Sequence, residues 1–267
     1  MKTPKLSIII PTFMQGDFIE STINSIIDQD YKNYEIIVID GGSTDQTVDI
    51  LKKHDKNIAF WISEEDSGPC EAINKGLQKV TGDWVTWQNS DDIFLPGAFS
   101  KVARSISQIG SRDDIALIIG NMRLIDMNGD AIREMKYVRT TFRSVIAEGM
   151  VLTNQAAFWR NDITKEIGFF DSSYICSFDF DWFVRVLKNY KAIHINKTLG
   201  CLRIYEETIS HQNMPSCIAE RDVIVSKQNI FFRFKLYFLI RRILLTLKNL
   251  ELKYLFKGIA RRICQKN

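Results

Sequence analysis

The stretch that decides the fold reads Leu6-Ser-Ile-Ile-Ile-Pro-Thr12. A continuous apolar run rich in β-branched residues is typical of a strand buried on both faces of a parallel sheet. Pro11 closes this run. Similar runs return three times before residue 88, at Tyr34–Ile39, Ile58–Ile62 and Asp83–Trp87.

Helical patterns fill the segments between these runs. We expect helices at Asp17–Asp28, from a cap at Ser43 or Thr44 to Lys53, at Pro69–Val80 and after Pro96. This alternation predicts the α/β class, with a mainly parallel sheet and helices on both faces. The second half reads as mixed, with short strands at Ala116–Ile119, Arg123–Ile125, Ala131–Glu134, Ala192–Ile195 and Cys201–Ile204, a hairpin turn at Asn128-Gly129 and a helix at Asp179–Lys188.

The length and composition exclude several classes of protein. The chain has 267 residues, of which 45% are apolar and 25% charged, and this is ordinary for a globular domain with an appendage. Its longest uncharged stretch, Thr208–Ala219, is shorter than the roughly 20 apolar residues of a transmembrane helix. No signal peptide is expected, because a strand pattern begins at Leu6. The five cysteines are scattered without metal spacing and fit a reduced, cytosolic setting.

The charge is unevenly distributed along the chain. Residues 229–267 hold ten basic residues and one acidic residue, a net charge of +9. The other 25 basic and 31 acidic residues give residues 1–228 a net charge of −6. We therefore divide the chain into an acidic body, 1–228, and a basic tail, 229–267, whose charge predicts an anionic partner.

The end of the tail has an amphipathic pattern. Apolar residues at helical spacing lie opposite basic ones, with Leu252, Leu255, Phe256, Ile259 and Ile263 on one side and Lys253, Lys257 and Arg261 on the other. This pattern is typical of a helix that lies on a membrane surface. The alternative is a terminal helix that packs on the body. Nucleic acid is not expected as a partner, because the body is acidic and carries no recognition motif.

Polar clusters follow three of the predicted strands, at Pro11-Thr12, at Asp40-Gly-Gly-Ser43 and at Asn89-Ser-Asp-Asp92. Turn chemistry explains each cluster singly, but ligands of parallel sheets bind at the edge where the strands end. The chain has no P-loop and no dinucleotide fingerprint. A carboxylate such as Asp40 can accept from a base or ribose hydroxyl, and paired aspartates suit Mg²⁺ or Mn²⁺ bound with phosphate oxygens. The pattern predicts a nucleoside diphosphate ester as ligand.

These clusters belong to a longer series of ordered motifs. Over roughly residues 6 to 210 the chain resembles the family 2 glycosyltransferases with the GT-A fold, through Leu6–Thr12, Ile37–Asp45, Asp66–Gly68, Ala72–Gly76, Thr81–Asp92, Gly168–Asp171, Asp179–Arg185 and Leu202–Ile204. The resemblance implies a nucleotide-sugar half, 1–110, and an acceptor half, 111–228.

The resemblance also implies roles for individual residues. For the nucleotide sugar these are Pro11, Thr12 and Asp40 at the base and ribose, Gly41 and Ser43 beside them, and Asn74, Lys75 and Asp91 near the phosphates or sugar. Asn89-x-Asp91 matches the metal-binding D-x-D motif, so Asp91 and the adjacent Asp92 are expected to hold Mg²⁺ or Mn²⁺. Gln155 is expected at the acceptor.

Asp179 matches the general base of the family, which implies inversion at the anomeric carbon by direct displacement. The alternative interpretation of Asp179 is a helix N-cap, and Asp181 is the second candidate for the base. Asn89, Phe178 and Tyr205 stand where relatives often have Asp, Glu and His. These departures keep open a catalytically inactive sugar-nucleotide binder or membrane scaffold.

The resemblance implies a complete reaction and a setting for it. A sugar would pass from a nucleotide-diphospho-sugar, with a UDP- or dTDP-sugar favoured, to a hydroxyl of a lipid-linked or growing cell-surface glycan. The enzyme would be cytoplasmic and peripheral on the inner face of the cell membrane, with the tail in contact with lipid.

Overall fold

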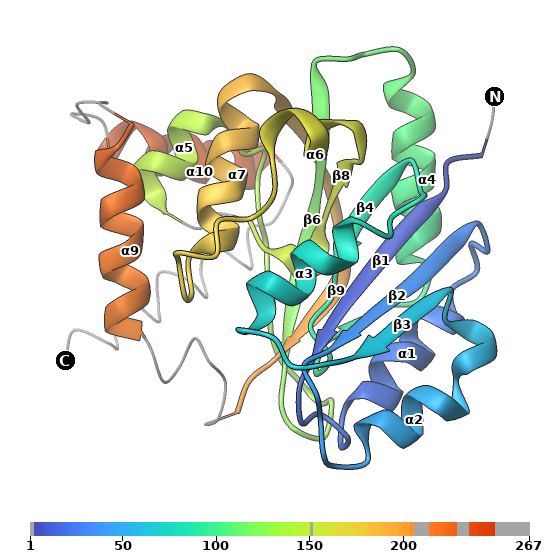
Figure 1. Cartoon of the computed structure of the whole chain (residues 1–267). Coiled ribbons are helices and arrows are strands. Elements are labelled where there is room, and N and C mark those ends of the chain that lie inside the picture. Colours follow the sequence, from blue (N-terminus) through green and yellow to red (C-terminus); the bar gives the residue numbers. More distant parts are fainter. Residues whose placement is uncertain (1–2, 150–151, 206–213, 229–234, 249–267) are drawn as a thin grey trace.

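The computed structural model describes residues 3–149, 152–205, 214–228 and 235–248. Nine strands in these ranges form one sheet in the order β3-β2-β1-β4-β8-β6-β9-β5, and β7 pairs with β6 (Figure 1). The strands are β1 (Leu6–Thr12), β2 (Tyr34–Asp40), β3 (Phe60–Ser63), β4 (Trp84–Trp87), β5 (Ile93–Phe94), β6 (Ile115–Ile125), β7 (Ala131–Met135), β8 (Ala157–Arg160) and β9 (Lys191–Arg203).

Helices cover both faces of the sheet. One face packs against α1 (Ile19–Ile27), α2 (Thr47–Lys53) and α4 (Ala98–Ile109), and the other against α3 (Pro69–Leu77), α5 (Phe142–Glu148), α6 (Asp162–Ile167) and α7 (Phe178–Asn189). Two short 3₁₀ helices, η1 (Asp55–Asn57) and η2 (Asn154–Ala156), and the helices α9 (Met214–Ser226) and α10 (Lys235–Lys248) complete the described chain.

The N-terminal half confirms the predicted parallel sheet. The strands β3, β2, β1 and β4 run parallel, and β1 pairs with β2 from Leu6↔Tyr34 to Thr12↔Asp40. Every residue of β1 is buried, as its unbroken apolar run requires. Because the register between β1 and β2 has no shift along its whole length, Thr12 and Asp40 lie at the same edge of the sheet.

The second half has fewer and longer strands than the sequence pattern predicts. The two strands expected at 116–119 and 123–125 are one strand, β6, and the two expected at 192–195 and 201–204 are one strand, β9. Polar residues interrupt both apolar patterns, but they pair with each other, as when Asn121 Nδ2 donates to Asn196 Oδ1 at 3.0 Å. Shifts in the β6–β9 register on either side of Asn121 absorb the interruption.

Two local expectations are wrong, and the alternative interpretation of Asp179 as a helix N-cap is excluded. The second helix begins at Thr47 rather than after a cap at Ser43 or Thr44, because the Ser43 side chain bonds Asp40 instead. Asp179 does not cap α7, whose N-cap residue is Ser177. The cysteines are not all reduced, because a disulfide joins Cys176 to Cys217.

The sequence predicts no transmembrane helix and an amphipathic helix in the tail. None of the helices in the four described ranges has the length and apolar character needed to cross a bilayer. The amphipathic helix predicted from Leu252 to Ile263 lies outside the described residues.

Candidate active site

The first part of the site lies where β1 and β2 end. Pro11 and Thr12 are the last two residues of β1, and the Thr12 hydroxyl is buried with no hydrogen-bond partner among the described residues. The buried Asp40 carboxylate accepts from the Ser43 amide at 2.9 Å, from the Ser43 hydroxyl at 2.5 Å and from the Ser63 hydroxyl at 2.6 Å. Ser43 therefore folds the loop after β2 onto Asp40.

Gly41 lets a second carboxylate approach the end of β2. A Cβ atom at Gly41 would lie 3.1 Å from Asp66 Oδ1, which is tighter than normal packing allows. The Gly68 amide donates to the same oxygen at 2.8 Å, and burial raises the pKa of Asp66. The sequence indicated Asp66 only as part of the motif Asp66–Gly68 and gave it no role. Its closeness to Gly41 shows that it lies at the same edge of the sheet as Asp40.

Asp92 is the hydrogen-bonding hub of the site. Its side chain is fully buried, and its two oxygens accept from the Arg203 amide at 2.8 Å, from Gln155 Nε2 at 2.7 Å and from Asn89 Nδ2 at 3.0 Å. Burial and the neighbouring Asp91 raise its pKa well above the usual range. Gln155 is itself buried, and its carbonyl oxygen accepts from Thr153. The interactions of Asp92 and Gln155 are thus with each other and with the strands around them.

Asp91 has a different environment from Asp92. One carboxylate oxygen accepts from the Tyr205 hydroxyl at 2.7 Å, and the carboxylate also forms a hydrogen bond with the backbone of its own residue. Burial raises the pKa of Asp91. Arg203 donates from Nε to the Asp91 carbonyl at 2.8 Å, and its guanidinium lies 4.9 Å from the centre of the Phe18 ring.

Sequence reasoning gave Arg203 no role. Its signal was its place at the centre of Leu202–Ile204, one of the motifs that carry the resemblance. The buried Arg203 side chain also donates to the carbonyls of Asp126 and Met127, so it joins β9 to the hairpin and to Asp91. The centre of the Tyr205 ring lies 5.5 Å from the centre of the Phe18 ring. Tyr205 stands where relatives often have a histidine, and its hydroxyl donates to Asp91.

The two residues of α3 expected near the donor make protein contacts. Asn74 Nδ2 donates to the Phe170 carbonyl at 2.9 Å, and Asn74 Oδ1 accepts from the Phe170 amide at 3.0 Å. This pair of bonds holds the loop that leads into α7. Lys75 forms ion pairs with Glu64 at 2.9 Å and Glu71 at 3.2 Å on the surface of the same half of the protein.

Asp179 lies in the first turn of α7 and keeps partial contact with solvent. Its Oδ1 accepts from the Phe180 amide at 2.6 Å, and burial raises its pKa to about 7. A carboxylate with this pKa is suited to accept a proton near neutral pH. Asp181 is paired with Arg185 at 2.8 Å, and Arg185 also donates to two carbonyls of the preceding loop. Because its carboxylate is paired with Arg185, Asp181 is the less suitable of the two aspartates as a general base.

An aromatic cluster connects Asp179 to the aspartate pair. Trp87, the last residue of β4, lies 5.0 Å from Phe170 and 6.4 Å from Phe178, measured between ring centres. Phe178 precedes Asp179, and Trp87 is followed two residues later by Asn89. The cluster therefore packs the first turn of α7 against the end of the strand that leads to Asp91.

A mainly parallel sheet with carboxylates at the ends of its strands, packed against a helix that carries a further carboxylate, is an arrangement suited to a nucleotide-dependent transferase. Comparison with known proteins gives the family. A sequence model described as glycosyl transferase family 2 matches residues 7–168, which is more than half of the chain. The chain belongs to glycosyl transferase family 2 and is a glycosyltransferase.

Characterised and uncharacterised bacterial proteins are similar in sequence. An uncharacterised glycosyltransferase of Haemophilus influenzae is 25% identical over 246 residues, which cover 90% of this chain and 95% of that protein. The GalNAc(5)-diNAcBac-PP-undecaprenol beta-1,3-glucosyltransferase of Campylobacter jejuni is 36% identical over 135 residues. That match covers 49% of this chain and 42% of the Campylobacter protein.

Solved structures share the fold at lower sequence identity. Residues 1–349 of Staphylococcus aureus TarS, in complex with UDP-GlcNAc, superpose with a TM-score of 0.62 at 20% identity, over 76% of this chain and 60% of that one. The mannosyltransferase PcManGT of Pyrobaculum calidifontis, with GDP-Man and Mn²⁺, also gives 0.62 at 15% identity, over 98% and 81%. These likenesses confirm the predicted GT-A fold.

Proposed function

We propose that this protein is an inverting glycosyltransferase that moves one sugar from a nucleotide-diphospho-sugar to an acceptor hydroxyl, with Asp179 as the general base. The observation that carries the proposal is the packing of Phe178 on Trp87, which connects a carboxylate of pKa about 7 to the end of β4, the strand that leads to Asp91. TarS, crystallised with UDP-GlcNAc, has the same fold and supports a UDP-sugar as donor.

The donor site we propose lies across the ends of β1, β2 and β4. The buried Thr12 hydroxyl without a partner and the Asp40 carboxylate offer polar groups to the base and ribose. Gly41 and the loop fixed by Ser43 complete that end of the site. Lys75, whose ammonium is shared by two glutamates, would have to leave them to reach a phosphate.

A divalent cation fits this site through a small set of protein ligands. Asp91 offers a carboxylate whose one side-chain hydrogen bond in the described chain is to the Tyr205 hydroxyl, and Asn89 offers an amide oxygen oriented by the bond of its Nδ2 to Asp92. Mg²⁺ and Mn²⁺ accept such oxygen ligands together with phosphates and water. Asp92 is the less favoured direct ligand, since its side chain is fully buried and accepts three hydrogen bonds from protein groups. When bound, the cation would stabilise the charge of the leaving diphosphate.

The reaction needs one base and no protein nucleophile. Asp179 takes the proton of the acceptor hydroxyl as that oxygen bonds the anomeric carbon. The bond from this carbon to the diphosphate oxygen breaks, and the nucleoside diphosphate leaves with the electron pair. Because attack comes from the face opposite the leaving group, the configuration inverts. Asp181, held by Arg185, orients the same helix.

We infer that the acceptor is a lipid-linked saccharide and that the protein contacts the cytoplasmic face of the membrane. The Campylobacter relative is named for a diphospho-undecaprenol substrate. On α10, Tyr237, Ile240, Leu244 and Leu247 are exposed at helical spacing. Arg139, Arg143, Lys188, Lys191 and Arg241 line a cavity of about 520 Å³ beside the same helix, and this charge favours an anionic surface.

Turnover of the Asp179→Asn variant tests the proposal. Release of nucleoside diphosphate from UDP-, dTDP- and GDP-sugars is measured with Mn²⁺ and with extracted lipid-linked saccharides as acceptors. We expect the wild type to turn over one donor, and the variant to bind its nucleotide normally but to lose turnover. If the variant keeps wild-type turnover, Asp179 is not the base. If the folded wild type transfers nothing, the inactive sugar-nucleotide binder becomes the better account.

A further inference from the structure

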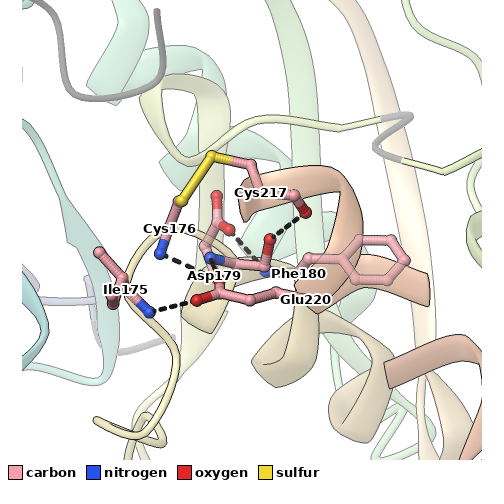
Figure 2. Close-up of a disulfide and its surroundings, with 7 residues drawn as sticks. Ile175, Cys176, Asp179, Phe180, Cys217 and Glu220 are labelled. Atoms are coloured by element: carbon pink, nitrogen blue, oxygen red, sulfur yellow. Dashed lines mark hydrogen bonds between the residues drawn. A yellow bond between two sulfur atoms is a disulfide. The ribbon is translucent and has the colours of Figure 1, made fainter. Parts of the chain in front are cut away.

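Helix α9 is fastened across the loop that precedes α7 (Figure 2). The disulfide between Cys176 and Cys217 joins residues 41 apart in the chain, and their Cα atoms are 5.2 Å apart. Beside it, the Ser177 hydroxyl donates to the Cys217 carbonyl at 3.0 Å. A covalent bond and a hydrogen bond therefore connect α9 to the residues that lead directly into α7.

Glu220 makes the most concentrated set of contacts at this junction. Its carboxylate accepts from three successive backbone amides, those of Ile175 at 2.8 Å, Cys176 at 3.1 Å and Ser177 at 2.8 Å. Figure 2 shows it reaching from α9 to the turn in front of α7. Ser177, the N-cap residue, makes no side-chain capping bond. These three amides precede Phe178, the first residue of α7, so a carboxylate from another helix fixes the turn in front of α7 and places negative charge near its N-terminus, where the helix dipole favours it.

The next residue of α9 contacts the same turn from a second direction. The guanidinium of Arg221 lies 5.3 Å from the centre of the Phe180 ring, and its charge lowers the pKa of Asp179, against the larger effect of burial. Phe180 also supplies the amide that bonds Asp179 Oδ1. Neighbouring residues of one helix therefore hold both the backbone before Asp179 and the residue after it.

We propose that Glu220 is a positioning residue for the base, and that α9 fixes the first turn of α7 so that Asp179 meets the acceptor hydroxyl in one orientation. The inference rests on the proposed role of Asp179. Glu220 belongs to no motif of the resemblance, and it lies beyond the residues that the family model matches. Its effect is expected on the chemical step, because its contacts are with the turn that carries the base rather than with the strand ends of the donor site.

The Glu220→Gln variant tests this role with little change in shape. A glutamine keeps one oxygen but places an NH₂ group against at least one backbone amide, so the three bonds cannot all persist. We expect kcat for the preferred donor to fall about 10- to 100-fold, as displacements of about 1 Å can cause. KM for the donor and the Kd of its nucleotide should change less than about twofold, because the hydrogen bonds of Glu220 are to the turn before α7 and not to the donor site.

Asp222→Asn is the matched control, since Asp222 is an exposed acid two residues further along α9. It should leave kcat and KM unchanged. Amide hydrogen exchange of both variants gives a readout independent of turnover, and residues 175–180 should exchange faster in Glu220→Gln alone. Assays run well below the melting temperature of each variant, so that a loss of folded protein cannot imitate a loss of kcat.

The outcomes separate this inference from the proposed function. If Asp179→Asn abolishes turnover while Glu220→Gln keeps wild-type kcat, the inference is wrong and the proposed function stands. If donor KM rises in step with the loss of kcat, or exchange at 175–180 is unchanged, Glu220 does not act through the first turn of α7. If the wild type has no turnover with any donor, the proposed function fails and the inference fails with it.

Discussion

The different environments of Asp91 and Asp92 predict opposite effects of removing each carboxylate. Asp92→Ala leaves three donors without an acceptor, the Arg203 amide, Gln155 Nε2 and Asn89 Nδ2, which now bond it at 2.7 to 3.0 Å. An unsatisfied buried donor costs about 1–3 kcal/mol. Burial makes the Asp92 carboxylate costly to ionise, so its removal offsets part of the loss from the three unsatisfied donors. We therefore expect the free energy of unfolding to fall by about 3 kcal/mol.

Asp91→Ala removes a single side-chain hydrogen bond, from the Tyr205 hydroxyl at 2.7 Å. The expected cost is about 1 kcal/mol or less in the free energy of unfolding. Binding should respond in the opposite way, since Asp91 offers an oxygen to the cation and Asp92 does not. Asp91→Ala should lose Mn²⁺-dependent nucleotide binding, and the milder Asp92→Asn should retain it.

Urea unfolding at constant m-value measures the stability of both alanine variants. Calorimetric titration with UDP and Mn²⁺ measures binding to Asp91→Ala and Asp92→Asn. Equal destabilisation by the two alanine substitutions would refute the division of roles between a metal ligand and a structural hub. Loss of metal-dependent binding in Asp92→Asn but not in Asp91→Ala would refute it from the other side.

Three further predictions concern pH, redox state and lipid. Turnover should fall about tenfold per pH unit below pH 7, because Asp179 becomes protonated there. Its pKa is about 7 in the folded state against 3.8 normally, so stability should be lost as pH rises across this window, and Asp179→Asn should flatten that dependence in urea unfolding. Reduction of the disulfide, which closes a loop across 41 positions, should lower the free energy of unfolding by up to about 4 kcal/mol, while a Cys176→Ser/Cys217→Ser double variant should show no response to reductant. Leu244→Glu should weaken sedimentation with phosphatidylglycerol-containing vesicles about tenfold, whereas unchanged binding would remove α10 from the membrane contact.

Continuous apolar runs made the first half of the fold predictable. The polar residues Ser7 and Glu35 lie inside the run ended by Pro11 and the run from Tyr34, but they are register partners of the two strands and bond each other at 2.5 Å. In the second half, polar residues such as Asn121 interrupt the strands. Their partners are on another strand, so local periodicity divided β6 and β9 into separate pieces.

The location of the site was predictable for a different reason. Parallel strands end at one edge, so residues as distant in sequence as Thr12 and Asp40 must meet there once the sheet is assigned. The roles within the site were less predictable. Asp92 accepts from Gln155, 63 residues away, and from Arg203, 111 residues away. No spacing rule connects such residues, and only the folded chain shows that Asp92 is fully buried among these donors.

The same limit explains the capping residue of α7 and the disulfide. Asp179 stands where a local capping pattern would put an acceptor, but the N-cap residue is Ser177, and Glu220, from a helix about forty residues further along, accepts from the amides that precede α7. Cys176 and Cys217 have no spacing that distinguishes them from the other cysteines. Both contacts depend on where α9 packs.

Binding of nucleotides to the purified protein tests the central claim most directly. Calorimetric titrations with UDP, dTDP, GDP and CDP are run with and without Mn²⁺, on the wild type and on Asp91→Ala. The account predicts that one nucleotide, UDP or dTDP, binds in a metal-dependent way and that Asp91→Ala loses this binding. A folded protein that binds none of the four, with or without metal, would contradict the donor site and the function built on it.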